Sequence, residues 1–94
     1  MRNFTRLPLM PVPYTVRLLS LRTAGLTGPL TGDWLLSLKN VVALDLSYNR
    51  LTGRLPDELG QMTQLRALML NGNGMFMSTL IFRSISTRLI VFDP

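Results

Sequence analysis

The chain has 94 residues, enough for one small domain, and its 47% hydrophobic and 16% charged residues exclude a disordered tail. It contains no Cys and no His, which excludes a disulfide framework and removes the commonest general base and metal ligand, so we expect no enzyme, no cofactor and no metal site. Ten Lys and Arg against five Asp and Glu give a net charge of +5, and a surface of this charge attracts acidic partners, membranes or nucleic acids. The arginines lack the interleaved aromatic residues of a nucleic-acid binder, so we interpret them as a solvated face.

Residues 1–15 are expected to form an irregular N-terminal segment. Prolines interrupt its apolar residues and Arg17 follows soon after, so we predict no signal peptide there. No stretch of the chain approaches the ~20 apolar residues of a membrane span. Asn3-Phe4-Thr5 is a glycosylation sequon, which matters only in the secretory pathway, and the compartment therefore stays open.

An internal repeat follows this segment and predicts parallel strands near residues 18–21, 43–46 and 67–70. The Leu-x-Leu pattern of the middle strand recurs once before it and once after it. The period of about 24 residues is within the range of leucine-rich repeats, whose units are stabilised by stacking on one another. We expect one shared core, made of Leu19, Leu21, Leu26, Leu44, Leu46, Leu51, Leu55, Leu59, Leu65, Leu68 and Leu70.

Each predicted strand is followed by an abrupt turn. Leu44 and Leu46 alternate with Asp45, as in a half-buried strand, so the leucines are expected to point inward and Asp45 outward. Asn49 follows where the chain must turn, and its amide can satisfy backbone groups that would otherwise be unpaired. We assign the same structural role to Asn73, which takes the equivalent place in the next unit.

The second half of each unit returns along the opposite side. Leu51 re-enters the core, Gly53 permits a conformation that a side chain would resist, and Pro56 fixes the next turn. Residues 57–60 then predict a brief helical turn, with acids at its start and a glycine at its end.

The run LDLSYNRLTGRLPDELGQMTQLRALML, residues 44–70, resembles the plant-type leucine-rich repeat of receptor-like kinases, receptor-like proteins and related secreted proteins. Its element Leu51-Thr52-Gly53-x-Leu55-Pro56 marks the plant subtype and implies a second short strand on the convex side. Over residues 16–75 the resemblance implies an α/β repeat: a short leucine-rich-repeat solenoid with a parallel concave sheet and an irregular or short-helical convex side.

The chain departs from this family pattern at several positions. In the first unit Ala24 replaces the turn asparagine, Thr31 replaces the proline, and Trp34 stands where Leu59 does. Residues 1–15 lack the paired cysteines and the tryptophan of the usual N-terminal cap. We divide the chain into residues 1–15, residues 16–75 with two complete repeats and the start of a third, and a divergent tail over residues 76–94.

The tail opens two alternatives. Met77 stands where the glycine of the repeat is expected and Leu80 where the proline is expected, and the residues that follow are rich in β-branched and aromatic side chains. Such a segment forms either a strand or hairpin that covers the open end of the stack, or a non-native extension.

The concave sheet is usually the binding face of such a stack, so the resemblance implies a protein or peptide ligand on it. Arginine and tyrosine are enriched at the energetic centres of interfaces, and we select Arg22, Tyr48 and Arg66 as contacts, with Asp45 as a charged neighbour. The alternative is that each of these residues is an ordinary solvated position on its strand. The full outward set is Arg17, Leu18, Ser20, Arg22, Thr23, Val42, Ala43, Asp45, Ser47, Tyr48, Arg66, Ala67, Met69, Asn71 and Gly72.

Two classes of function remain. The first is a protein-interaction module, a fragment or truncated relative of a receptor ectodomain, whose full-length relatives carry a membrane anchor or a kinase domain that this chain lacks. The second is a truncated gene-model remnant with no dedicated partner. Neither class has catalytic residues in this chain.

Overall fold

The computed structural model describes residues 16–38, 40–85 and 90–92; the expected irregular segment over residues 1–15 and the Asn3 sequon lie outside them. Strand, strand and helix follow one another three times, and a last strand comes after them. The elements are β1 (Leu18–Ser20), β2 (Thr27–Pro29), α1 (Gly32–Leu36), β3 (Ala43–Asp45), β4 (Arg50–Arg54), the 3-10 helix η1 (Asp57–Gln61), β5 (Ala67–Met69), β6 (Gly74–Phe76), α2 (Thr79–Ile85) and β7 (Ile90–Phe92).

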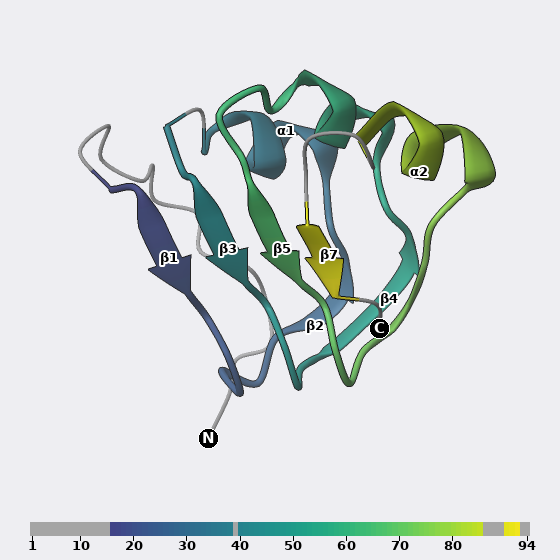
Figure 1. Cartoon of the computed structure of the whole chain (residues 1–94). Coiled ribbons are helices and arrows are strands. Elements are labelled where there is room, and N and C mark those ends of the chain that lie inside the picture. The colour runs from purple at the N-terminus through teal and green to yellow at the C-terminus, as the bar shows by residue number, and fades with distance from the viewer. Residues whose placement is uncertain (1–15, 39, 86–89, 93–94) are drawn as a thin grey trace.

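The strands form two parallel sheets. One has four strands in the order β1-β3-β5-β7, which lie side by side in Figure 1, and the other has three in the order β2-β4-β6. Leu19, Leu44 and Leu68 pair in register across the first sheet, as the period predicted. The three strands expected near residues 18–21, 43–46 and 67–70 are therefore confirmed as parallel, and so is the second short strand of each unit.

A short helix closes each unit at the amino-terminal ends of the four-stranded sheet, where α1 and α2 lie in Figure 1. The helices begin differently. Thr31 caps α1, because its hydroxyl oxygen accepts a 3.2 Å hydrogen bond from the backbone N–H of Trp34. Pro56 precedes η1 without a side-chain cap, and η1 forms where the sequence predicted a brief helical turn. Repeating strands and helices in this order make an α/β repeat fold.

The core lies between the two sheets and the helices. Nine of the eleven leucines expected there are buried, but Leu19 and Leu21 are only half-buried. These two pack against the edge of the core, because β1 is at the end of its sheet and pairs, among the described strands, with β3 alone. Leu44 and Leu68, by contrast, are in β3 and β5, which have a paired strand on each side.

Trp34 does not take the core position that Leu59 has in the next unit. It is half-buried and packs against the core, while Leu35 is fully buried. The two units differ because residues 32–36 form an α-helix and residues 57–61 a 3-10 helix, which place successive side chains at different angles. The indole Nε1 of Trp34 is buried and has no hydrogen-bond partner among the described residues.

The tail continues the repeat as a helix and a strand. Helix α2 buries Ile81 and Ile85 in the core, and β7 pairs in parallel with β5. A hairpin was one expectation for this segment; in the described residues its first half is helical, because the apolar side chains of Ile81 and Ile85 are four residues apart and so face one side of a helix.

Candidate functional site

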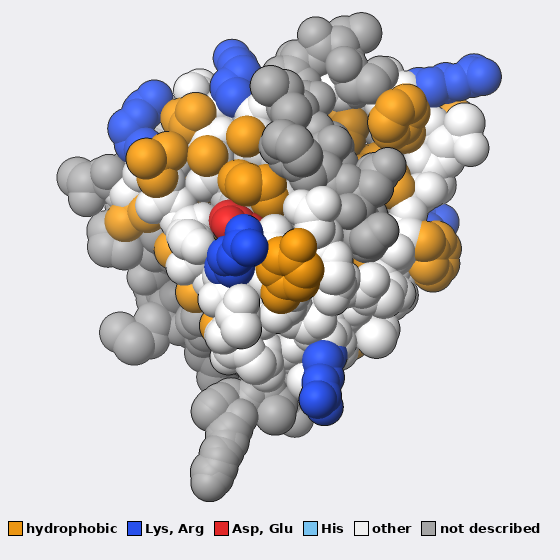
Figure 2. Space-filling model, turned by 60° about the horizontal axis from the view of Figure 1, so that its bottom comes forward, with side chains coloured by type: hydrophobic (Ala, Val, Ile, Leu, Met, Phe, Trp, Pro, Cys, Tyr) orange, Lys and Arg blue, Asp and Glu red, His pale blue; other side chains and the backbone are white. Residues whose placement is uncertain are grey.

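Three of the four residues selected as contacts come together at the carboxyl ends of β1 and β3. The guanidinium carbon of Arg22 lies 4.7 Å from the centre of the Tyr48 ring, and Arg22 Nη1 lies 4.0 Å from Asp45 Oδ2. We call Arg22, Asp45 and Tyr48 the Arg22 cluster. On the face drawn in Figure 2, a red, a blue and an orange side chain lie together.

The backbone on both sides of Arg22 is fixed to the next unit. The N–H of Leu21 donates to the Asp45 carbonyl at 2.8 Å, and the N–H of Thr23 donates to the Ser47 carbonyl at 3.0 Å. The parallel hydrogen bonding therefore continues past the end of β1. This places Arg22 beside the following unit, where its side chain reaches Asp45 and Tyr48.

Asp45 is held from two directions. Its Oδ1 accepts a 2.9 Å hydrogen bond from the backbone N–H of Ser47, while Oδ2 faces Arg22. The ion pair is long and the Arg22 side chain is 56% exposed, so it contributes at most about 1 kcal/mol to stability. The guanidinium of Arg22 makes no hydrogen bond with the described residues besides this ion pair.

Tyr48 is presented to solvent by the turn that follows β3. The side chain is 53% exposed, and the backbone has a φ of +56°. The equivalent positions in the other units, Thr23 and Gly72, also have positive φ, at +53° and +74°. Because all three share this conformation, the repeat geometry imposes it at Tyr48, at a cost of about 1–2 kcal/mol for a residue with a side chain.

Gly72 supports the Tyr48 ring from the neighbouring unit. A Cβ atom added at Gly72 would lie 2.4 Å from Cδ1 of Tyr48, so the ring rests on the glycine Cα. The Tyr48 N–H also donates to the Asn71 carbonyl at 2.6 Å. This supporting role of Gly72 was not predicted from the sequence, although Gly72 stands one repeat after Tyr48.

Arg66, the fourth selected residue, does not join the Arg22 cluster. It precedes β5 at the opposite end of the sheet, whereas Met69 is the register partner of Asp45, about 10 Å further along the strand. The Arg66 guanidinium donates instead to the carbonyls of Thr63 at 2.8 Å and Leu65 at 3.2 Å. The structure thus brings together three of the four residues.

One outward assignment was wrong. Ser47 was expected to face outward but is 1% exposed. The reason is that β3 ends at Asp45, and the alternation of a strand does not extend into the turn that follows.

The side chains of Asn49 and Asn73 join neighbouring units at the turns. Asn73 Oδ1 accepts from the Leu51 N–H at 3.0 Å, and its Nδ2 donates to the carbonyls of Leu46 at 2.9 Å and Leu70 at 3.1 Å. Asn49 is 7% exposed and makes the same kind of bridge. Its partners are the N–H groups of Ala24 and Leu26 and the carbonyls of Leu21, Leu46 and Ser47.

The arrangement is suited to presenting a surface. Within the described ranges, no three His, Cys, Asp or Glu residues are grouped so as to hold a metal ion, and no helix is long and apolar enough to cross a membrane. A hollow of about 450 Å³ on the helical side is lined, among the described residues, by uncharged side chains only: Leu36, Asn40, Gln61, Met62, Thr63 and Gln64. What the Arg22 cluster offers is an exposed aromatic ring, a positioned guanidinium and a carboxylate.

Comparisons with known proteins give two matches. The sequence model of the family described as "Leucine rich repeat" matches residues 15–75. Over 40 residues, 43% of this chain, the sequence is 52% identical to the LRR receptor-like serine/threonine-protein kinase FEI 2 of Arabidopsis thaliana. The chain covers 7% of the length of that relative.

Proposed function

The chain belongs to the leucine-rich-repeat family, and from that premise we propose that it is a protein-interaction module that binds a protein or peptide ligand through the outward face of its four-stranded sheet. The Arg22 cluster carries this proposal. Tyrosine and arginine are the residue types most enriched at the energetic centres of interfaces, and here the ring of Tyr48 already orients the Arg22 guanidinium at 4.7 Å. A side chain held in place before binding loses less entropy when a partner arrives.

The binding face is the concave side of a short solenoid. Neighbouring strands of a sheet are about 4.8 Å apart, whereas packed helices are about 8–10 Å apart. Helices α1, η1 and α2 pack in that order beside the strands, so the helical side must spread more than the sheet. A difference of this kind bends the stack toward the four-stranded sheet.

Residues 76–94 form a cap on the repeat domain at residues 16–75. The support comes from α2, which buries Ile81 and Ile85 against the third unit, and from the pairing of β7 with β5. Side chains that complete a core in this way behave as a cap, because they remove the apolar edge of the last unit from water.

The kinase named in the comparison supports only part of this proposal. Its match concerns a stretch of repeats in this chain and 7% of its own length. We therefore propose a receptor-like recognition role for this chain. We do not extend the kinase activity of that relative to it.

Affinity capture from a relevant lysate tests the proposed face. The wild-type chain is compared with the double variant Arg22→Ala/Tyr48→Asn, because asparagine tolerates the positive φ at position 48 and so removes the ring without adding strain. Arg54→Ala is the control, since Arg54 is exposed on β4 and pairs with Asp57 at 3.0 Å. The double variant is expected to weaken binding by ~2 kcal/mol or more, and the control to leave it unchanged.

Two outcomes contradict the proposal. Equal loss with Arg54→Ala means that capture depends on charge alone. No specific partner for the folded wild-type chain, with folding verified by circular dichroism, favours a remnant without a dedicated partner.

A further inference from the structure

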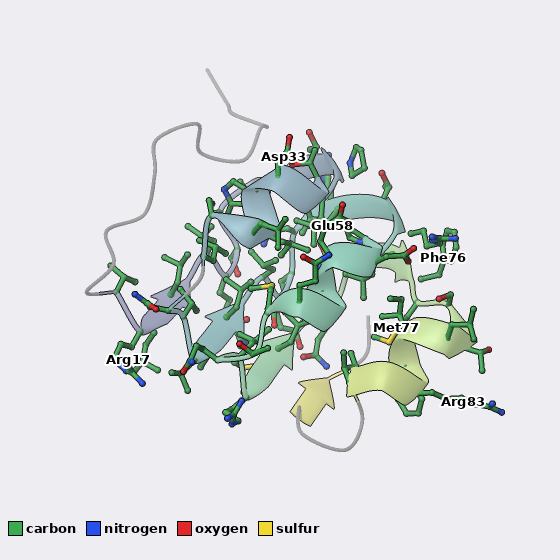
Figure 3. All side chains as sticks on the ribbon, turned by 90° about the horizontal axis from the view of Figure 1, so that it is seen from above. Arg17, Asp33, Glu58, Phe76, Met77 and Arg83 are labelled. Atoms are coloured by element: carbon green, nitrogen blue, oxygen red, sulfur yellow. The ribbon has the colours of Figure 1, made fainter. Side chains whose placement is uncertain are left out.

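The charged side chains are divided unevenly between the two sides of the described molecule. Within the described part of the chain, the four-stranded sheet and the residues next to its strands carry three exposed arginines, Arg17, Arg22 and Arg66. They carry one acid, Asp45. The other described acids, Asp33, Asp57 and Glu58, are on α1 and η1. Figure 3 shows Arg17 beside the four-stranded sheet and Asp33 and Glu58 on the helices.

The acid on the sheet side is already engaged. Asp45 uses Oδ1 for the Ser47 N–H and faces Arg22 with Oδ2. The Arg17 side chain has no hydrogen bond or ion pair to any described residue, and that of Arg66 contacts backbone carbonyls only. The face therefore keeps an excess of positive charge that is not neutralised by these neighbours.

The three arginines lie at opposite ends of the sheet. Arg17 and Arg66 are on one row at its start, because the Val42 N–H donates to the Arg17 carbonyl at 2.6 Å and the Arg66 N–H donates to the Val42 carbonyl at 2.7 Å. Two strand spacings separate them, about 10 Å. Arg22 lies five residues after Arg17, about 16 Å along an extended chain.

Between the two ends of the four-stranded sheet, its outward face carries small and apolar side chains. Ala43 and Ala67 are register partners in the middle of the sheet and are half-buried, so a peptide backbone can approach them closely. Leu18 beside them is 74% exposed. Figure 2 shows orange side chains gathered between blue ones on the face that it draws.

We propose that the partner of this face is an acidic peptide segment in extended conformation, with one carboxylate at the Arg22 cluster and another at Arg17 and Arg66. This rests on the proposed function and specifies its ligand. A guanidinium binds a carboxylate through two parallel hydrogen bonds. Tyr48 holds the guanidinium of Arg22, which faces Asp45 with Nη1 and makes no hydrogen bond with the described residues. The spacing of the arginines fits acidic residues about four or about six positions apart, which share one face of an extended peptide.

A random peptide display library selected on the full chain tests this. Enriched peptides are synthesised, and their affinities are measured by fluorescence anisotropy for wild type, Arg22→Gln, Arg17→Gln/Arg66→Gln and Tyr48→Asn. Arg50→Gln removes the same charge from an exposed position on β4 and is the matched control for Arg22→Gln. We expect enrichment in Asp and Glu, about tenfold or greater loss of affinity in the arginine variants of the sheet face, an unchanged affinity in Arg50→Gln, and weaker binding at high salt.

The other outcomes separate the inference from the proposed function. Peptides that are not acidic, and that lose affinity with Tyr48→Asn but not with the arginine variants, overturn the inference and leave the binding face intact. Equal losses with Arg50→Gln overturn the inference, because general charge then explains binding. A selection that yields no peptide dependent on any of these side chains overturns both.

Discussion

The ring of Tyr48 rests on the Cα atom of Gly72 in the next repeat, where a Cβ atom would lie 2.4 Å from Cδ1 of the ring. Gly72 thus serves two purposes: its φ of +74° suits glycine, and its missing side chain leaves room for the tyrosine. The same ring stacks on the Arg22 guanidinium. The position of the cluster therefore depends on three successive units.

Gly72→Ala is expected to destabilise the protein more than Gly25→Ala. Both glycines have a φ of +74°, but a Cβ at Gly25 meets nothing within 4 Å. Gly25→Ala should cost about 1–2 kcal/mol for the backbone alone. Gly72→Ala adds the displacement of the Tyr48 ring, which we place at about 1 kcal/mol.

Urea denaturation followed by circular dichroism measures the difference. In a Tyr48→Ala background the two glycine variants should become equal. A gap that persists without the ring would show that Tyr48 is not what Gly72 accommodates.

Asn49→Ala is expected to cost about 2–4 kcal/mol. The side chain satisfies backbone groups of two units at 7% exposure, and its loss leaves several of them buried without partners. Asn71→Ala is the control, because the Asn71 side chain makes no hydrogen bond with the described residues while its carbonyl still accepts from Tyr48. Similar urea midpoints for the two variants would contradict the bridging role.

Leu46→Ala should lower the free energy of unfolding by roughly 2–5 kcal/mol, enough to unfold a small repeat protein. Leu46 is fully buried between neighbouring units. Leu18→Ala removes the same atoms from a strand position that is 74% exposed, and it should change stability by less than about 0.5 kcal/mol. An unchanged midpoint in Leu46→Ala would mean that the repeat register is wrong.

The role of the tail as a cap can be tested on one helix. Ile85 is fully buried and Leu80 is 78% exposed, so Ile85→Ala should cost about 2–5 kcal/mol and Leu80→Ala almost nothing. Deleting residues 77–94 should expose the apolar edge of the third unit and promote aggregation, which light scattering detects. A truncated chain that stays monomeric and equally stable would refute the cap.

Much of the fold followed from the sequence because the repeat is a local pattern. Its period predicted the strands at β1, β3 and β5 and their register, since equivalent leucines must stack to share a core. The resemblance to the plant-type repeat implied the second strand, and the acids and glycine of residues 57–60 predicted the short helix of the middle unit. Periodicity did not predict α2, because Met77 and Leu80 replace the glycine and proline that mark the unit.

The selection of Arg22, Asp45, Tyr48 and Arg66 came from residue type and outward phase, which are properties of single strands. Only the tertiary structure decided that the first three meet and that Arg66 lies at the other end of the sheet. Contact between side chains of different units depends on the position along the strand and on the turn that follows it. The positive φ at Tyr48 and the missing side chain of Gly72 set the direction of the Tyr48 ring. Neither can be predicted from the alternation of apolar and polar residues.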